Sequence, residues 1–353
     1  MLLLVTACRA PEPPLNLIIV LVDTTRADRL GYHGYVRPTS PRLDALARSS
    51  VAFVNHYSHS SRTGPSVASI FTGLHPRSHG VVNPLTHWDA KGTLGPDQTT
   101  LAELLTARGY RCSGFVSNVN VSPRFGFAQG FEFYDIFHDP QGRSLKGSTV
   151  SLRLNETKSP FFLYLHYMQP HSSYEAPAPY ATMFTEESYD RPITGDHIQL
   201  DAIVGGKVLP TDADRRHLGA LYDQEIRYFD DLLGELLDYF GEAGLLEESI
   251  LVFIADHGEE IFDHGSVLHG YTLYEEQLRV PLLIRDPRRL EPRRVEAVSR
   301  HVDLLPTLLE LLGVPPELAL QGASLVPLID GAAEPDEARP VFAQSSLRAV
   351  KTI

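Results

Sequence analysis

Two apolar segments that each end in an aspartate constrain this chain more than any other feature of its sequence. Residues 16–22 (NLIIVLV) run directly into Asp23, and residues 249–255 (SILVFIA) run directly into Asp256. Continuous apolar, β-branched runs of this length are typical of strands that are buried on both faces of a sheet. A carboxylate at the end of such a strand is costly unless it is paired or binds a cation. The sequence therefore predicts two buried strands that deliver acids to a site.

Helical patterns alternate with strand patterns along the chain. Short strands are predicted near residues 113–117, 161–166 and 280–284, and helices near 40–47, 100–109, 212–241 and 303–312. This alternation predicts an α/β fold: a doubly wound, mostly parallel central sheet with helices on both faces. Ligands of such sheets bind beyond the carboxyl ends of the strands. Both aspartates are expected at that edge.

A histidine follows the second of these acids, in the sequence Asp256-His257-Gly258-Glu259. The chain has 15 histidines and only two cysteines, which favours imidazole and carboxylate ligands over thiolate. We expect one divalent cation (Mn, Zn, Ca or Mg) held by Asp23, Asp256 and His257. For His257 the alternative is a helix-capping or core imidazole. A second ion through His264 or His269 is an open alternative.

A hydroxyl-rich segment, residues 58–73 (SHSSRTGPSVASIFTG), leads into a short apolar helix. Pro65 is suited to the first turn of that helix. The N-terminus of a helix offers unpaired N–H groups and a positive dipole end, so a hydroxyl placed there faces a site that favours anions. The alternative is that these serines and threonines merely cap a turn.

Five segments, taken in order, resemble the sulfatase family of the alkaline phosphatase superfamily. They are residues 17–35 (LIIVLVDTTRADRLGYHGY), 63–80 (TGPSVASIFTGLHPRSHG), 160–174 (PFFLYLHYMQPHSSY), 250–284 and 302–328. The resemblance implies that Asp23, Asp256 and His257 bind the metal and that Thr63 occupies the nucleophile position. It also implies that His171 faces the substrate and that His269 lies near a second basic group that contacts the anion.

Several residues depart from the pattern of that family. Sulfatases convert a Cys or Ser at the nucleophile position to formylglycine, and Thr63 cannot yield that aldehyde. The second acid after the first strand is Thr24, and the arginine of the nucleophile motif is Val67. Asn118 stands in place of the family's basic element, where it either contacts the substrate or serves as a structural asparagine.

These residues predict a metal-dependent hydrolase that cleaves a phosphate or phosphonate ester, because water can hydrolyse a phosphothreonine directly at phosphorus. Three alternatives stay open: a sulfuric ester hydrolase, an envelope phosphoethanolamine-type transferase, and a catalytically silent metal-binding homologue. Lys plus Arg number 31 against 44 Asp plus Glu, a formal charge of −13. Such a chain is a poor binder of nucleic acid, so we expect an anionic ester as its partner.

The ends of the chain suggest its organisation and location. Residues 1–15 begin with an apolar run before Cys8 that resembles the lipobox of bacterial lipoproteins, with a frayed apolar N-terminus as the alternative. The lipobox predicts a membrane tether through lipid on Cys8 and a bacterial cell-envelope or periplasmic location. Residues 16–340 are the predicted catalytic domain, with long loops or a lid over 142–210. Residues 341–353 are expected to start a small, truncated C-terminal subdomain.

Overall fold

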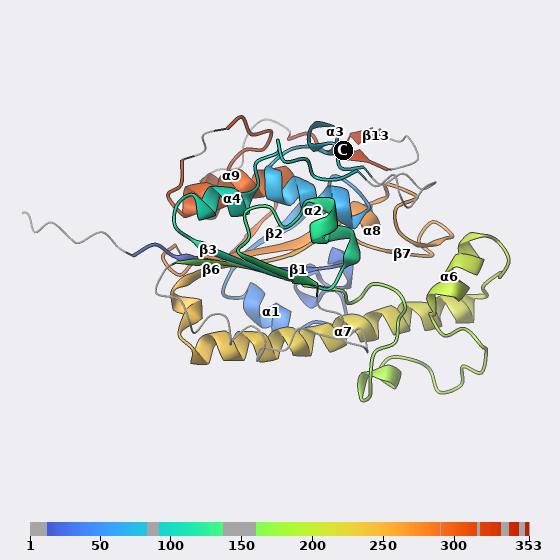
Figure 1. The fold of residues 1–353 in the computed structure, drawn as a ribbon. Coiled ribbons are helices and arrows are strands. Elements are labelled where there is room, and N and C mark those ends of the chain that lie inside the picture. Colours follow the sequence, from blue (N-terminus) through green and yellow to red (C-terminus); the bar gives the residue numbers. More distant parts are fainter. Residues whose placement is uncertain are drawn as a thin grey trace, which may run out of the picture.

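The computed structural model describes residues 13–82, 92–136, 160–289, 291–315, 318–332, 339–345 and 350–352. Within these ranges one nine-stranded sheet forms the centre of the molecule, in the order β10-β2-β9-β6-β1-β5-β3-β4, with β11 beside β2 (Figure 1). The strands of this sheet are β1 (Asn16–Val22), β2 (Val51–Tyr57), β3 (Arg111–Val116), β4 (Phe133–Ile136), β5 (Phe161–Tyr167), β6 (Ser249–Ala255), β9 (Arg279–Arg285), β10 (Arg293–Val295) and β11 (Ser299–Arg300).

Strand β9 runs antiparallel to both of its neighbours, β2 and β6, whereas the other pairings in the sheet are parallel. Two small antiparallel pairs lie outside the sheet: β7 (Glu260–Ile261) with β8 (Val267–Leu268), and β12 (Phe342–Gln344) with β13 (Val350–Thr352). The predicted mostly parallel α/β sheet is therefore confirmed.

Helices cover both faces of the sheet. In the described part of the chain they are α1 (Pro41–Ala47), α2 (Thr63–Thr72), α3 (Pro76–His79), α4 (Leu101–Thr106), α6 (His197–Val204), α7 (Asp212–Glu242), α8 (Glu275–Leu278), α9 (Leu304–Leu311) and α10 (Val326–Ile329). Figure 1 shows α2, α4 and α9 on one side of the sheet and α1 and α7 on the other.

Strand β1 shows why both faces are apolar. Its side chains alternate between faces, so Leu17 and Ile19 pack into the core beneath α2, α4 and α9, while Ile18 and Val20 pack into the core beneath α1 and α7. Every residue of β1 is buried. A strand that feeds two cores must be apolar at successive positions, which is the pattern that the sequence has.

The register of the central strands fixes where the site forms. Strand β1 lies between β5 and β6, and its last residue, Val22, pairs with Tyr167 on one side and with Ala255 on the other. Since β1 and β6 are parallel and end in step, the next residues, Asp23 and Asp256, leave the sheet side by side. The fold therefore brings together two acids that are far apart in the sequence.

Most of the predicted elements are present, but the segment expected to be loops contains a helix. Strand β5 is followed by irregular chain and then by α6, which Asp196 caps by accepting hydrogen bonds from the N–H groups of Ile198 and Gln199. Only Leu200 and Ile203 of α6 are buried, so eight residues supply too little apolar periodicity to reveal a helix. Cys8 and residues 137–159 lie outside the described residues.

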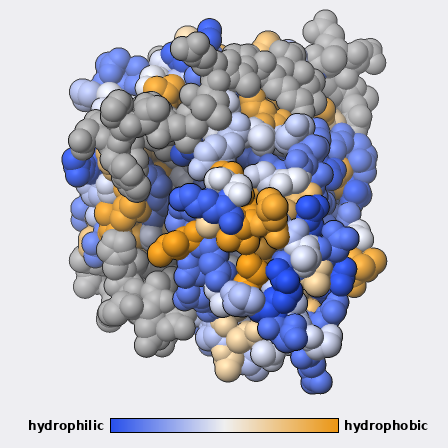
Figure 2. All heavy atoms as spheres, turned by 90° about the vertical axis from the view of Figure 1, so that its right-hand side faces the viewer, coloured by the Kyte–Doolittle hydropathy of each residue, from blue (hydrophilic) through white to orange (hydrophobic). Residues whose placement is uncertain are grey.

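Residues 341 and 343, near the end of the chain, pack against the rest of the molecule. Val341 and Ala343 are buried in a small cluster with Tyr57, Leu273 and Leu278. Figure 2 shows the face on the right-hand side of Figure 1, where hydrophobic residues gather near the middle among hydrophilic ones. In the described chain, no helix combines the length and the apolar character needed to span a membrane.

Candidate active site

Asp23 and Asp256 form the floor of the site, and both side chains are fully buried. One oxygen of each carboxylate is satisfied by protein. Asp23 Oδ2 accepts from Asn118, and Asp256 Oδ1 accepts from the backbone N–H groups of Thr24 and His257, at 3.1 and 2.8 Å. The remaining oxygens, Asp23 Oδ1 and Asp256 Oδ2, have no hydrogen-bond partner. Two buried, unpartnered carboxylate oxygens require a cation or bound water.

Thr24 supplies one of these contacts through an unusual backbone conformation. Its φ is 49°, in the left-handed region that a β-branched residue rarely adopts. This conformation lets the Thr24 N–H reach Asp256, while the Thr24 carbonyl accepts from the Tyr222 hydroxyl at 2.7 Å. Such strain is characteristic of functional sites. In this protein the conformation of Thr24 orients the Asp256 carboxylate.

The hydrogen bonds of His257 fix its tautomer. Its Nδ1 lies 2.9 Å from the carbonyl oxygen of Gly258, so Nδ1 carries the hydrogen and Nε2 is a bare lone pair. That Nε2 lies 3.4 Å from Asp256 Oδ2 and 3.9 Å from Asp23 Oδ1. Burial, reinforced by the neighbouring His269, holds the pKa of His257 well below its usual value. A neutral imidazole with a bare Nε2 is the form that binds metals.

Asp23, Asp256 and His257 together fit a divalent cation. Their ligand atoms all lie within 4.8 Å of one another. Burial and the nearby charge of Asp23 raise the pKa of Asp256 well above its usual value. For Asp23, burial is opposed by the His166 hydrogen bond and the neighbouring histidines, which hold its pKa low. Two oxygens and one imidazole nitrogen suit Mn²⁺, Zn²⁺, Mg²⁺ or Ca²⁺.

Thr63 is the first residue of α2 and lies at this floor. Its Oγ1 is 3.4 Å from His257 Nε2 and 3.4 Å from Asn118 Nδ2. Pro65 is in the first turn, as the sequence predicts. Val67, at the position of the family's motif arginine, is fully buried in the core on the α2 side of the sheet. The hydroxyl therefore stands between a helix N-terminus and the predicted metal ligands.

Asn118 and His166 both contact Asp23, and Asn118 also contacts Thr63. Asn118 follows β3 and is 1% exposed; its Nδ2 donates to Asp23 Oδ2 at 2.6 Å, and its Oδ1 accepts from the Asn120 N–H. His166, near the end of β5, places Nε2 3.3 Å from the same Asp23 oxygen. The Nδ2 contacts of Asn118 are with Asp23 and Thr63, so this side chain holds both groups in place. Sequence reasoning missed His166, because a histidine within an apolar strand resembles a core residue.

His269 and His171 lie above the predicted metal ligands. The His269 ring centroid is 4.5 Å from that of His257 and 5.0 Å from that of His171. Glu259 lies 2.9 Å from His269 Nδ1 and accepts from the Tyr174 hydroxyl at 3.3 Å. His171 Nδ1 is occupied by the Ser172 carbonyl oxygen at 2.7 Å. In both rings Nε2 is the nitrogen left for a ligand.

Two residues near His171 and His269, namely Glu259 and Arg62, have no role in the predictions from the sequence. Burial raises the pKa of Glu259 to about 8, so this carboxyl can share a proton with His269 near neutral pH. Arg62, directly before Thr63, lies against Gly270, where an added Cβ would come within 2.6 Å of its Nε. The hydroxyl-rich segment contained this arginine, but its position in space depends on the loop after β8. His264 is displaced from the site and pairs with Glu276 at 2.8 Å.

Replacing Glu259 tests whether it positions His269. We expect Glu259→Leu to lower kcat about tenfold to a hundredfold, since a freely rotating imidazole loses its fixed Nε2 direction. Glu259→Gln, which keeps a hydrogen-bonding partner for Nδ1, should recover most of that loss. Steady-state kinetics with an aryl ester would separate kcat from KM. Equal kcat values for the wild type and the Leu variant would remove Glu259 from the mechanism.

Known proteins resemble this chain in both sequence and fold. The family model described as Sulfatase matches residues 15–314. The multifunctional alkaline phosphatase superfamily protein PehA of Trinickia caryophylli is 27% identical, over 89% of this chain and 77% of its own length. Human arylsulfatase A is 28% identical over 97% of this chain and 75% of its length. The phosphonate monoester hydrolase of Agrobacterium radiobacter shares the fold, with a TM-score of 0.76 at 22% identity, over 93% of this chain and 80% of that one. Because the family model covers most of the chain, this protein belongs to the sulfatase family of the alkaline phosphatase superfamily.

Proposed function

We propose that this protein is a metal-dependent hydrolase of phosphate or phosphonate esters in which Thr63 is the nucleophile. One observation carries the proposal: the Thr63 hydroxyl lies 3.4 Å from His257 Nε2, beside two buried carboxylate oxygens that have no partner. A nucleophile, a cation site and a helix N-terminus thus meet at one point. Membership of the sulfatase family supports hydrolysis of a charged ester.

In the proposed reaction, each residue of the site has a distinct role. A cation held by Asp23, Asp256 and His257 would lower the pKa of the Thr63 hydroxyl and shield the negative charge of the ester. Thr63 Oγ1 attacks phosphorus, the bond to the leaving alcohol breaks, and water then hydrolyses the phosphothreonine. Asn118 keeps the hydroxyl in place beside Asp23.

Groups on the opposite side of the site face the anion. His171 and His269 offer Nε2 to the substrate oxygens or to the leaving oxygen, and Arg62 adds a fixed positive charge next to Thr63. Hydrogen bonds to an anion in a buried site are stronger than the same bonds in water. These groups compensate locally for the acidic character of the whole chain.

The threonine side chain favours phosphorus over sulfur. The formylglycine hydrate of sulfatases releases sulfate by elimination through its second hydroxyl, and a threonine sulfate has no such hydroxyl. A phosphothreonine needs none, because water attacks at phosphorus. The relatives include a phosphonate monoester hydrolase and arylsulfatases, so a sulfate ester is the substrate against which this preference must be measured.

Removing the metal provides the experiment. The purified full chain should contain about one equivalent of divalent cation, and EDTA treatment should abolish hydrolysis of bis(4-nitrophenyl) phosphate and of 4-nitrophenyl phenylphosphonate. Activity should return with one of Mn²⁺, Zn²⁺, Ca²⁺ or Mg²⁺. Metal analysis and absorbance at the nitrophenolate band provide the two readouts.

The same assay distinguishes the alternatives. Faster turnover of 4-nitrophenyl sulfate than of either phosphorus ester would overturn the phosphorus preference. Full activity after complete metal removal would overturn the metal dependence. Metal binding without turnover of any ester would identify the chain as a silent homologue.

A further inference from the structure

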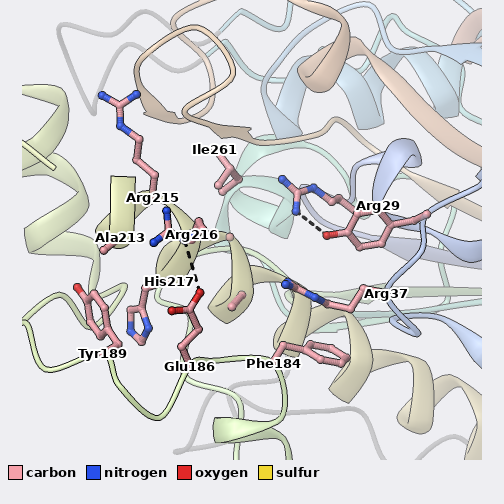
Figure 3. A pocket seen from close by; sticks show the side chains of 13 residues that line it. Arg29, Arg37, Phe184, Glu186, Tyr189, Ala213, Arg215, Arg216, His217 and Ile261 are labelled. Carbon is pink, nitrogen blue, oxygen red and sulfur yellow. Dashed lines mark hydrogen bonds and ion pairs between the residues drawn. The ribbon is translucent and has the colours of Figure 1, made fainter. Parts of the chain in front are cut away.

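A cavity of about 370 Å³ lies beside the first turns of α7, and none of the predicted metal ligands or catalytic residues lines it (Figure 3). Its walls come from the segment after β1, from the loop before α6, from α7 and from Ile261. Cavities of this size accommodate small organic ligands. We call it the arginine pocket, because Arg29, Arg37, Arg215 and Arg216 all line it.

The charge of the arginine pocket is opposite to that of the whole chain. The chain carries a formal charge of −13, yet four arginines line this cavity against a single carboxylate, Glu186. Figure 3 shows the guanidinium groups of Arg29 and Arg37 pointing toward the same interior space. A concave surface that concentrates guanidinium groups attracts anions, above all planar or tetrahedral oxyanions.

Arg29 and Arg37 share one compensating charge. Both contact the fully buried carboxylate of Asp223, which lies behind them and does not line the cavity. The Tyr35 hydroxyl also donates to Asp223, at 2.6 Å. Burial raises the pKa of Asp223 despite these partners. One carboxylate thus serves two guanidinium groups, which leaves a positive charge and N–H donors for a ligand.

The other two arginines are poorly compensated. Arg216 Nε lies 3.5 Å from Glu186, and both side chains are more than 60% exposed, so the ion pair is weak. The Arg215 guanidinium lies 5.3 Å from the centroid of the Phe262 ring. Among the residues that the structure describes, Arg215 has no carboxylate within ion-pair distance.

Aromatic side chains form part of the wall. Tyr189 stacks on His217 with ring centroids 3.8 Å apart, and the Arg37 guanidinium lies 5.3 Å from the centroid of Phe184. Flat aromatic faces next to guanidinium groups suit a ligand that carries a ring or carbon skeleton as well as an anion. A bare inorganic ion would leave these faces unused.

We propose that the arginine pocket is a second binding site, for a small organic phosphate or sulfate ester, separate from the Thr63 site. A tetrahedral anion occupies the space between the arginines, and its organic part lies against Phe184 or Tyr189. The pocket adjoins the active site along α7, since Tyr222, one turn beyond Gly219, donates to Thr24. The proposal is independent of the identity of the nucleophile.

Binding of phenylphosphonate to the full-length protein tests this proposal. The compound has a tetrahedral anion and a ring but no ester bond, so it is not turned over. We compare the wild type, Arg215→Gln/Arg216→Gln and the control Arg48→Gln/Arg294→Gln by isothermal titration calorimetry. Arg215 and Arg216 are exposed at the start of α7, so their replacement is compatible with folding. Occupancy of the Thr63 site is followed separately, as inhibition of ester hydrolysis.

We expect the wild type and the control to bind one more equivalent of phenylphosphonate than Arg215→Gln/Arg216→Gln. If the variant still binds this equivalent, its Kd should be at least about tenfold weaker. Inhibition at the Thr63 site should be the same in all three proteins. Benzenesulfonate in place of phenylphosphonate distinguishes sulfate from phosphate esters as occupants. Identical stoichiometry and affinity in all three proteins would overturn the proposal.

Discussion

Thr63→Val should lose at least about a thousandfold in kcat/KM on an aryl phosphate diester, a change of about 4 kcal/mol in transition-state stabilisation. Valine keeps the branched shape of threonine and removes only Oγ1, the atom that lies 3.4 Å from His257 Nε2 and from Asn118 Nδ2. The metal content should be nearly unchanged, because Thr63 is not among the three predicted ligands. Kinetics and metal analysis of the same preparation provide the measurement.

Thr63→Ser is the matched control, since it restores a hydroxyl at the same position. It should retain a large part of the activity that the valine variant loses. Rapid acid quenching during turnover, followed by mass spectrometry, should find one phosphoryl group on the peptide that contains Thr63. Equal hydrolysis by the wild type and the valine variant would assign the nucleophile elsewhere.

We expect acid to destabilise this protein, because several of its histidines are buried and neutral. Burial lowers the pKa of His56, His59 and His79 to about 3 from the ordinary value of 6.5. The unfolded chain therefore binds more protons than the folded chain between pH 6.5 and pH 3. The stability that these neutral histidines contribute is fully present above pH 6.5 and decreases as the pH falls through this window. At pH 5 each of these three histidines should lower the free energy of unfolding by about 2 kcal/mol.

The contacts of these histidines explain why their pKa values are lowered. His79 accepts from the Val81 N–H through Nδ1 and lies 3.1 Å from the Ser69 hydroxyl through Nε2, an arrangement that only the neutral ring allows. His59 and His56 each leave Nε2 buried without a partner. A proton added at any of these sites would be buried without a compensating charge.

Among the described residues, six carboxyl groups whose pKa burial raises oppose this effect: Asp223, Asp230, Asp256, Glu259, Glu260 and Asp286. Burial raises the pKa of Glu259 to about 8 and that of Asp230 to about 6, so both favour the folded state as the pH falls. His301, whose pKa burial also lowers well below the usual value, adds to the destabilising side. In the described part of the chain, nine histidines have a lowered pKa against these six carboxyls, so we expect the net slope to keep its sign.

Urea unfolding at pH 7.5 and at pH 5 tests this prediction. The free energy of unfolding should fall by several kcal/mol, a large share of the 5–15 kcal/mol typical of a folded protein. His79→Gln should reduce the difference between the two pH values by about 2 kcal/mol. His197→Gln, at an exposed position, should leave that difference as in the wild type. A free energy that is independent of pH would contradict this explanation.

The two strands that carry the acids of the site could be predicted because burial on both faces requires an unbroken apolar sequence. Strands β1 and β6 are buried on both faces, so they must be apolar throughout, and the acids that follow them are conspicuous. Strand β2 was not predicted. It is buried except at Asn55, contains the polar residues Asn55 and His56, and its register against β9 shifts between Phe53 and His56. The His56 contact with Ser299 on β11 explains this polar residue only once the sheet is known.

The site could be predicted only in part, for a similar reason. Asp23, Asp256 and His257 follow buried strands, a pattern that is visible in the sequence. Thr63 is singled out by the resemblance to the nucleophile motif of the family, within a hydroxyl-rich segment that leads into a helix. The contacts of His166, Arg62 and Glu259 depend on which loops meet above the sheet, and a single sequence does not encode that as a local pattern. The arginine pocket is an extreme case, since its arginines come from two segments nearly two hundred residues apart.

The most direct test of the central claim is the position of the metal ion relative to Thr63. A crystal of the protein grown with Mn²⁺ should give one strong anomalous peak within coordination distance of Asp23 Oδ1 and Asp256 Oδ2, the two unpartnered oxygens, with Thr63 Oγ1 beside it. A peak remote from these atoms, in protein that hydrolyses phosphorus esters, would contradict the account.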